Sequence, residues 1–185
     1  MSNPSMATAT IHEALAELKI IEKRRAAKVQ ELVNNLVRDS RLVDPLLVQD
    51  SKSGGQPEFV RATLQSIRDL DARFIRIRHA IQLSNEDTRN SIIIGGTTRT
   101  IAEWLIWKRE TASKEKELLA GMRGAISNVR VQVTRLNQQA GSQQTDIVIN
   151  YSEAQLLKDT EDFEQTWGAL DGQLSLRNAT VTITY

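Results

Sequence analysis

The two histidines are the residues best suited to metal binding or acid–base chemistry, and their positions support neither. His12 and His79 lie on different predicted helices, without an H-x-x-x-H or H-E-x-x-H arrangement. A zinc site needs three or four converging ligands, and the chain has no cysteine to supply one. No Ser–His–Asp arrangement or close carboxylate pair stands out either. We therefore expect a non-enzymatic protein with no catalytic residue, no bound metal and no cofactor.

A phosphate site is a second possibility, at Gly95-Gly96-Thr97-Thr98. Its backbone N–H groups come just before a predicted helix start, where anions bind favourably. The segment lacks the G-K-[ST] that a phosphate-binding loop carries. We interpret it as a turn in which glycine adopts a positive φ.

Charge gives little reason to expect nucleic acid. The 24 Lys and Arg residues nearly balance the 23 Asp and Glu residues, so the net charge is +1. The basic residues near 19–28 and 68–78 alternate with acidic ones, as on the solvated face of a helical bundle. We expect no nucleic-acid partner.

The three tryptophans are candidates for a partner surface, because tryptophan is enriched where binding energy concentrates. Trp167 falls on an apolar stripe, and we expect it to be buried. Trp104 and Trp107 flank such a stripe, and we expect at least one of them, Trp107 first, to reach a neighbouring subunit.

Four long helices would position these residues. Capping boxes, in which a Thr or Ser and the residue three positions later exchange hydrogen bonds, occur at Thr10, Thr100 and Ser152, and Pro57 suits a first helical turn. We predict helices over 10–38, 57–84, 100–136 and 152–177. Residues 39–56 form the main loop, and 85–99 form a turn with extended backbone.

The predicted second helix has an apolar stripe in steps of three and four residues, typical of a helix that packs lengthwise on another: Val60, Leu64, Ile67, Leu70, Phe74, Ile77 and Ile81. The predicted third helix has a stripe from Ile101 to Leu136, which Lys108 and Glu115 interrupt. This stripe continues past Gly121 and Gly124, each of which costs about 1 kcal/mol relative to Ala. We expect either a bend there or the close approach of another backbone.

Two segments have strand character. Residues 145–151 contain Ile147-Val148-Ile149, and residues 179–185 alternate Thr with Val, Ile and Tyr. Alternation is typical of a strand with one face covered. The terminal strand needs a hydrogen-bonding partner: residues 92–94, residues 147–149, or the same strand of another copy. If it pairs with another copy, Val181, Ile183 and Tyr185 join Trp104 and Trp107 in the interface between subunits.

These elements predict a mainly α protein, an elongated bundle of long antiparallel helices with a small β element that includes a C-terminal strand. We expect a single helical domain over 1–185. Residues 1–10 lack the features of a secretory signal, and no apolar run has the length of a transmembrane helix. We expect a soluble protein, located in the cytoplasm or a virion, with no membrane partner.

The order of elements also resembles that of the septicolysin-like family of small bacterial helical proteins, mainly over residues 57–185. The resemblance rests on the segments Ser84-Asn85-Glu86-Asp87-Thr88, Gly96, Thr100-Ile101-Ala102-Glu103, Leu105, Lys108-Arg109-Glu110 and Asn178-Ala179-Thr180. It implies a helical bundle with a small strand element and brings no established catalytic residues. Trp104, Trp107 and the Thr-rich final strand depart from the family pattern.

Apolar stripes that one chain cannot hide indicate self-association. We expect a structural or assembly protein that forms a homo-oligomer and occupies a fixed place in a larger particle, such as a phage capsid-decorating cement protein. The alternative, suggested by the septicolysin-like resemblance, is a membrane-active, pore-forming toxin whose helices expose apolar faces to lipid.

Overall fold

Helices account for most of the chain in a computed structural model that describes residues 7–49, 54–139 and 147–185. The chain divides into two compact units, where a single domain was expected. Unit 1 contains Met1–Ser84 and Arg177–Tyr185, and unit 2 contains Asn85–Leu176. Two long helices cross from one unit into the other along the sequence. Each unit is described by itself.

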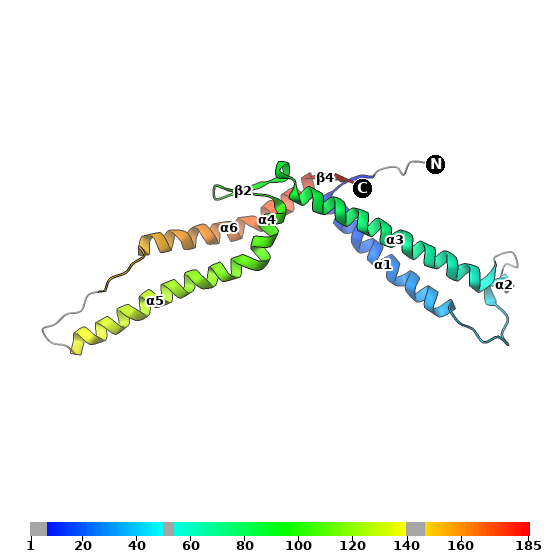
Figure 1. The fold of residues 1–185 in the computed structure, drawn as a ribbon, viewed down its shortest axis with the longest axis horizontal. Coiled ribbons are helices and arrows are strands. Elements are labelled where there is room, and N and C mark those ends of the chain that lie inside the picture. The colour runs from blue at the N-terminus through cyan, green and yellow to red at the C-terminus, as the bar shows by residue number, and fades with distance from the viewer. Residues whose placement is uncertain (1–6, 50–53, 140–146) are drawn as a thin grey trace. The chain divides into compact units, whose positions relative to one another are not determined.

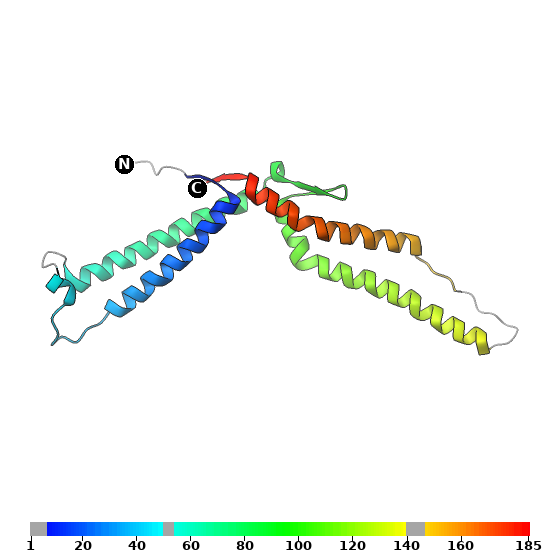
Figure 2. The same ribbon diagram turned by 180° about the vertical axis from the view of Figure 1, so that it is seen from behind.

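Unit 1 is an antiparallel pair of long helices closed at one end by two strands (Figures 1 and 2). Its elements are β1 (Thr8–Thr10), α1 (Ile11–Asn35), the short α2 (Pro45–Gln49), α3 (Gly55–Glu86) and β4 (Thr182–Thr184). β1 and β4 pair antiparallel, with Ala9 opposite Ile183. The terminal strand thus finds its partner near the start of its own chain, at a segment that was not among the three expected partners.

The core of unit 1 is concentrated at the end next to the strands. Its buried residues are Ile11, Ala14, Leu18, Ile21, Ile77, Ile81 and Ile183. Beyond Ile21, no residue of α1 is fully buried, because α3 is the one helix that covers it in the described part of the unit. A helix pair alone buries a single seam, so the far half of α1 keeps its apolar side chains at least partly in water.

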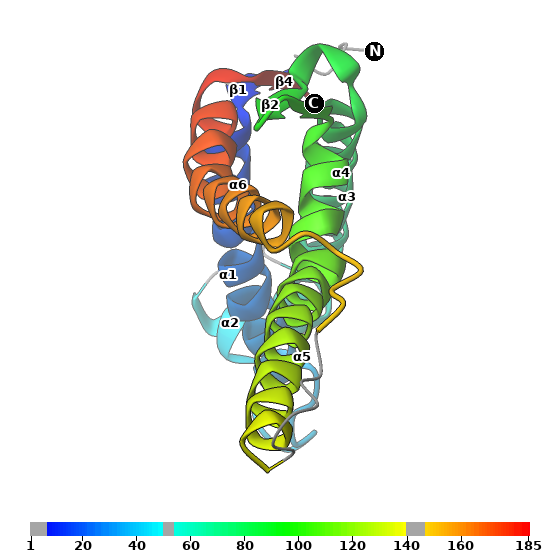
Figure 3. The ribbon, with the colours of Figure 1, turned by 90° about the vertical axis from the view of Figure 1, so that its left-hand side faces the viewer.

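Unit 2 has the same plan with a hairpin of strands in place of the β1–β4 pair. It contains the short 3₁₀ turn Thr88–Asn90, β2 (Ile92–Ile94), β3 (Thr97–Arg99), α4 (Ile101–Ile106), a π-helical turn (Trp107–Thr111), α5 (Ala112–Gln139) and most of α6 (Glu153–Thr180). The hairpin lies at the α4 end of the unit, away from the far end of α5 (Figure 3).

Gly95 and Gly96 form the two-residue turn of this hairpin. Their φ angles are 56° and 78°, which a residue with a side chain rarely adopts. Ile94 and Thr97 face each other on either side of the turn, as in a two-residue hairpin loop. The interpretation of this segment as a glycine turn is therefore confirmed.

The helical axis bends at the π-helical turn, between α4 and α5, and not at the glycines (Figure 1). One extra residue per turn interrupts the regular hydrogen-bond ladder and is a recognised cause of a kink. A side-chain carbon at Gly121 or Gly124 would have open space around it. Neither explanation that we gave for these glycines holds within this chain.

The two halves of the chain begin with nearly the same residues. Thr8-Ala9-Thr10-Ile11-His12-Glu13-Ala14-Leu15 corresponds to Thr98-Arg99-Thr100-Ile101-Ala102-Glu103-Trp104-Leu105. Both segments form complete capping boxes, at Thr10 with Glu13 and at Thr100 with Glu103. The strand that opens each half pairs with the strand that ends the other half. The fold therefore consists of two strand–helix–helix–strand repeats that exchange their final strands.

The mainly α fold with a small β element, including a C-terminal strand, is confirmed. The predicted strand over 145–151 is wrong in its described part, because residues 147–149 form no strand; residues 145 and 146 lie outside the described residues. Ile147 and Ile149 instead pack beside α5, where half-burial of their side chains satisfies the apolar pattern without a ladder.

Candidate assembly surface

Trp104 and Trp107 lie in the core of unit 2 and not at a subunit surface. Their exposed fractions are 1% and 8%. The Trp104 indole N–H donates to the carbonyl oxygen of Ile92 at 3.0 Å, and the Trp107 N–H donates to Glu115 Oε2 at 3.0 Å. The two rings meet edge to face, with centroids 5.6 Å apart. Their predicted role in an interface is wrong, because the β2–β3 hairpin and α6 cover the side of α4 that the sequence left open.

Trp167 shows the opposite error, since it was expected to be buried and is 47% exposed. The buried residues of α6 nearest to it, Phe163 and Leu170, follow a seven-residue spacing. Trp167 falls between them at the edge of this row, where its ring stacks on Phe163 with centroids 6.3 Å apart. One face of the indole is thereby left to solvent.

The C-terminal strand completes the core of unit 1. Ile183 is buried among residues of α1 and α3, and Val181 and Tyr185 pack against the same cluster. The Tyr185 hydroxyl donates to Glu17 Oε2 at 2.6 Å. These three residues were expected at an interface between copies if the strand paired between chains, and the intramolecular β1–β4 pairing uses them within one chain instead.

Tyr185 and Glu17 shift each other's titration. Burial, followed by the hydrogen bond to Glu17, raises the pKa of Tyr185 to about 12. Burial acts to raise the pKa of Glu17, but hydrogen bonds from Tyr185 and Arg73 and the nearby cationic charges outweigh it, so this pKa is lowered. The contact therefore favours a neutral phenol beside a charged carboxylate across the physiological range.

The chemical candidates do not come together. His12 lies on α1 and His79 on α3, both exposed, and the described residues contain no group of three or more His, Asp or Glu side chains arranged to hold a metal ion. The cleft beside Gly95 and Thr97, of about 310 Å³, is also lined by one cationic side chain, Arg99, and by three carboxylates, Glu115, Asp159 and Asp162. Carboxylates repel a phosphate, and here they outnumber the guanidinium, so this cleft is poorly suited to one.

The least covered long apolar surface of unit 2 is on α5. Leu119, Met122, Ile126, Val129, Val133 and Leu136 follow one another in steps of three and four, the spacing of a coiled-coil seam. We call these six residues the α5 seam. None of them is fully buried, and Val129 and Leu136 are 42% and 52% exposed.

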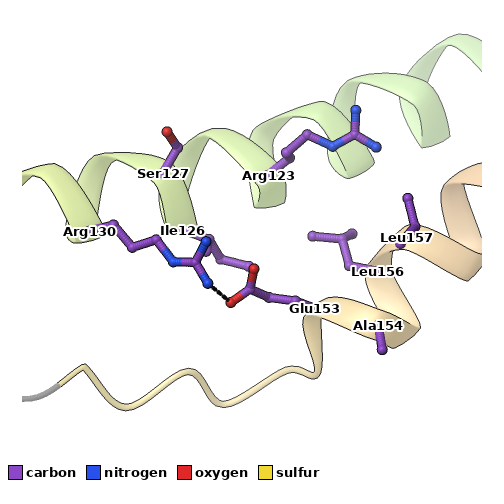
Figure 4. Close-up of a pocket in the computed structure, with 8 residues that line it drawn as sticks. All are labelled: Arg123, Ile126, Ser127, Arg130, Glu153, Ala154, Leu156 and Leu157. Atoms are coloured by element: carbon purple, nitrogen blue, oxygen red, sulfur yellow. Dashed lines mark hydrogen bonds and ion pairs between the residues drawn. The ribbon is translucent and has the colours of Figure 1, made fainter.

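The first turn of α6 reaches only part of the seam. Arg130 forms an ion pair with Glu153, the first residue of α6 (Figure 4). The cleft between the helices here, of about 530 Å³, is lined by Arg123, Ile126, Ser127, Arg130, Glu153, Ala154, Leu156 and Leu157. α5 continues beyond this point, past the start of α6 (Figure 1). Val133 and Leu136 therefore lie where α6 offers no further turn.

Residues 147–151 border the seam on another side. An apolar cleft of about 290 Å³ is lined by Met122, Ala125, Ile126, Val129 and residues 147–151. Ile126 lines both this cleft and the one beside Glu153. The seam is therefore hollowed on both sides, and neither α6 nor residues 147–151 fill the hollows.

Charge is separated between the two helices of this hairpin. From Leu118 to its end, α5 carries Arg123, Arg130 and Arg135 and no acidic residue. The first twelve residues of α6 carry one lysine and the carboxylates Glu153, Asp159, Glu161, Asp162 and Glu164. Among the described residues, Arg123 and Arg135 form no ion pair, and neither do Glu161 and Glu164.

Sequence reasoning found the apolar stripe of α5 and missed that this stripe, and not the tryptophans, is the open surface. The signal was present in the sequence as the opposite charges of residues 118–139 and 153–164. It shows which helices attract each other, whereas the length of α6 and the bend at the π-helical turn decide how much of the stripe is covered.

No family model and no curated protein matches the chain. Among solved structures it is similar to a functionally unknown conserved protein from Corynebacterium diphtheriae, at 16% sequence identity, over 96% of this chain and 99% of that chain, with a TM-score of 0.48. Similarity at this level supports no conclusion about function. The resemblance to septicolysin-like proteins stays a prediction. In the described part of the chain, every helix is too short or too polar to cross a membrane.

Proposed function

We propose that the chain is a non-enzymatic structural protein that works by assembling with copies of itself. The observation that carries this proposal is the α5 seam, a row with coiled-coil spacing on a 28-residue helix in which no residue from Ser113 to Gln138 is fully buried. An apolar row left in water costs free energy that association recovers.

A fixed place in a larger particle is the specific form of this proposal, with a capsid-decorating cement protein of a phage as the example. Two helical hairpins in one chain, each with an incompletely covered arm, suit a part that contacts several neighbours. Co-sedimentation of the purified protein with capsids that lack it tests this form. Saturable binding at a fixed ratio to the capsid subunit supports it, and free protein alone contradicts it.

Sedimentation equilibrium of the intact 20.8 kDa chain tests self-assembly itself. The proposal predicts a defined oligomer at micromolar concentration, because a seam of six apolar residues supports specific helix packing. A chain that stays monomeric up to about 100 μM would have a self-affinity well below that of stable protein complexes. That result contradicts the proposal.

A membrane-active protein is the second candidate, and one observation favours it. The segment that joins α1 to α3 exposes several large aliphatic side chains at the far end of unit 1: Leu36, Val37, Leu42, Val43, Leu47 and Val48. Apolar side chains at such a tip insert into the interfacial region of a bilayer. Dye release from liposomes by the wild type, abolished by Val37→Asp together with Val43→Asp, supports this candidate. No release, together with a stable oligomer, supports the structural role.

A further inference from the structure

We infer that two copies of this chain dock through their unit 2 hairpins, so that α5 of each copy packs against α6 of the other. This inference rests on the proposed self-assembly and names the surface that performs it. The partner is a second copy of the chain, and the product is a four-helix bundle with an isologous, two-fold interface.

The apolar rows of the two helices are unequal, which leaves one row of α5 without a partner row on α6. The α5 seam has two rows, one with Leu119, Ile126 and Val133 and the other with Met122, Val129 and Leu136. α6 offers a single buried row at seven-residue spacing, with Leu156, Phe163 and Leu170. Between these buried residues, at 159–160 and 166–167, the helix has polar or exposed side chains.

Exposure shows which seam row is left over. Leu119, Ile126 and Val133 are all half-buried, whereas Val129 and Leu136 of the other row are exposed. This second row is therefore the one that a further helix covers. A coiled-coil knob fills a hole formed by four residues of the facing helix, so covering this row requires a helix with its own flanking apolar side chains. Leu157 and Trp167, both exposed on α6, are of that kind.

Charge selects α6 of another copy as that helix. Arg123 occupies the position that directly follows a seam residue, where coiled coils place the charges that pair between helices. Arg123 and Arg135 form no ion pair within the described part of their own chain, and Glu161 and Glu164 likewise form none. A second copy brings the acidic helix to the basic one twice, once in each direction, because the interface is two-fold.

The unit 1 hairpin of another copy fits this surface less well. The far half of α1 carries Lys23, Arg24, Arg25 and Lys28 against Glu22 and Glu31, and α3 over 55–76 carries Arg61, Arg68, Arg73 and Arg76 against Glu58, Asp69 and Asp71. Both helices carry an excess of positive charge. Like charges across an interface suppress a partner, so the basic α5 favours α6 over either of these helices.

Charge reversal with mixing tests the inference in the full-length chain. One variant carries Arg123→Glu and Arg135→Glu, and a second carries Glu161→Arg and Glu164→Arg. The matched control carries Arg68→Glu and Arg76→Glu on α3. It changes the net charge of the chain by the same amount as the first variant does, but within unit 1. Sedimentation equilibrium gives the molar mass of the monomer or oligomer that each protein forms. Circular dichroism melting establishes that each protein is folded.

The expected result is a wild-type dimer, an unchanged control, and two folded variants whose dissociation constants rise roughly 100-fold, since each replaces attraction by repulsion at both copies of the contact. An equimolar mixture of the two variants restores the dimer, because the basic helices of one variant meet the acidic helices of the other. A folding defect does not produce such a rescue.

Each other result overturns a distinguishable claim. If both variants keep the wild-type dimer, or if the mixture of two folded monomeric variants stays monomeric, the inferred surface is wrong while self-assembly stands. If the control dissociates and the unit 2 variants do not, the interface lies on unit 1. If the wild type itself is a monomer, the proposed function fails together with the inference.

Discussion

Unit 1 and unit 2 start from nearly the same capped segment and fill the positions after the cap differently. Ala14 of α1 corresponds to Trp104 of α4, and Glu17 corresponds to Trp107. We call the packing at the strand end of each hairpin its closure. In unit 1 the closure consists of the small Ala14, the strand β4 and a polar contact between Glu17 and Tyr185. Unit 2 closes with a cluster of aromatic rings. One backbone plan supports either kind of closure.

The arms of the two hairpins differ in charge as well as in core. In unit 1, α1 over 22–35 carries four cationic residues against two acidic ones, and α3 over 55–76 carries four against three, whereas α5 and α6 of unit 2 carry opposite charges. Opposite charge lets the unit 2 arm match a copy of itself, and like charge works against this in unit 1. This difference supports the proposal that unit 2 is the part that recognises another copy.

Deletion of residues 181–185 gives the largest expected effect and separates the two closures. Unit 1 loses the buried Ile183, the half-buried Val181 and Tyr185, and the hydrogen bonds between β1 and β4. We expect its free energy of unfolding to fall by about 5 kcal/mol. The three tryptophans all lie in unit 2. In urea, the helical signal therefore shifts to lower denaturant while the tryptophan emission transition stays in place. Equal shifts of the two signals contradict independent closure.

Trp104→Ala addresses the aromatic closure and is expected to cost about 4 kcal/mol. The change removes a ring that is 1% exposed and the N–H that satisfies the Ile92 carbonyl. Trp167→Ala is the matched control, because its ring is half exposed, and we expect about 1–2 kcal/mol from the smaller lost area. Urea titration followed by circular dichroism measures both, at a protein concentration below the association range, so that the proposed contact of Trp167 with another copy does not contribute. Similar costs for the two variants would place Trp167 in the core after all.

The sequence was sufficient for the class of fold, the helix starts at Thr10 and Thr100, and the glycine turn, because each depends on neighbouring residues. It was misleading for Trp104, Trp167 and the partner of the terminal strand, because these depend on contacts between segments far apart in the chain. The repeat of Thr-x-Thr-Ile-x-Glu before α1 and α4 could have revealed the strand exchange. How much of the α5 seam is covered depends on the residue at which α6 begins to pack on α5. No local sequence pattern determines that residue.

Tyr185→Phe tests the polar closure of unit 1 and its dependence on pH. The folded pKa of Tyr185 is raised from 10.0 to about 12, so its contribution is complete below pH 10 and is lost as the pH rises from 10 to 12. We expect the variant to be about 1 kcal/mol less stable at pH 7, from loss of a hydrogen bond to a carboxylate. Urea unfolding at pH 7 and pH 11 measures the gap, which narrows at the higher pH. A gap independent of pH contradicts the assignment to the phenol.

Gly121→Ala and Gly124→Ala give the smallest expected effect, a gain of about 0.5–1 kcal/mol each, because alanine lowers the entropy cost of helix formation. Apart from the adjoining backbone of the helix itself, no atom of the described residues lies within 4 Å of a carbon added at either position, and neither position belongs to the α5 seam. Thermal melting and sedimentation should therefore show higher stability and an unchanged mass. Dissociation of the oligomer by either change would move the interface to the glycine face. Gly96→Ala, at a φ of 78°, is a control that should destabilise.

Hydrogen–deuterium exchange at two protein concentrations tests most directly whether another copy covers α5. The account predicts that backbone amides over 118–138 and 153–167 become more protected as concentration rises through the association range, while amides over 22–35 of α1 exchange at the same rate. Protection that is independent of concentration, or that rises in α1 alone, would contradict it.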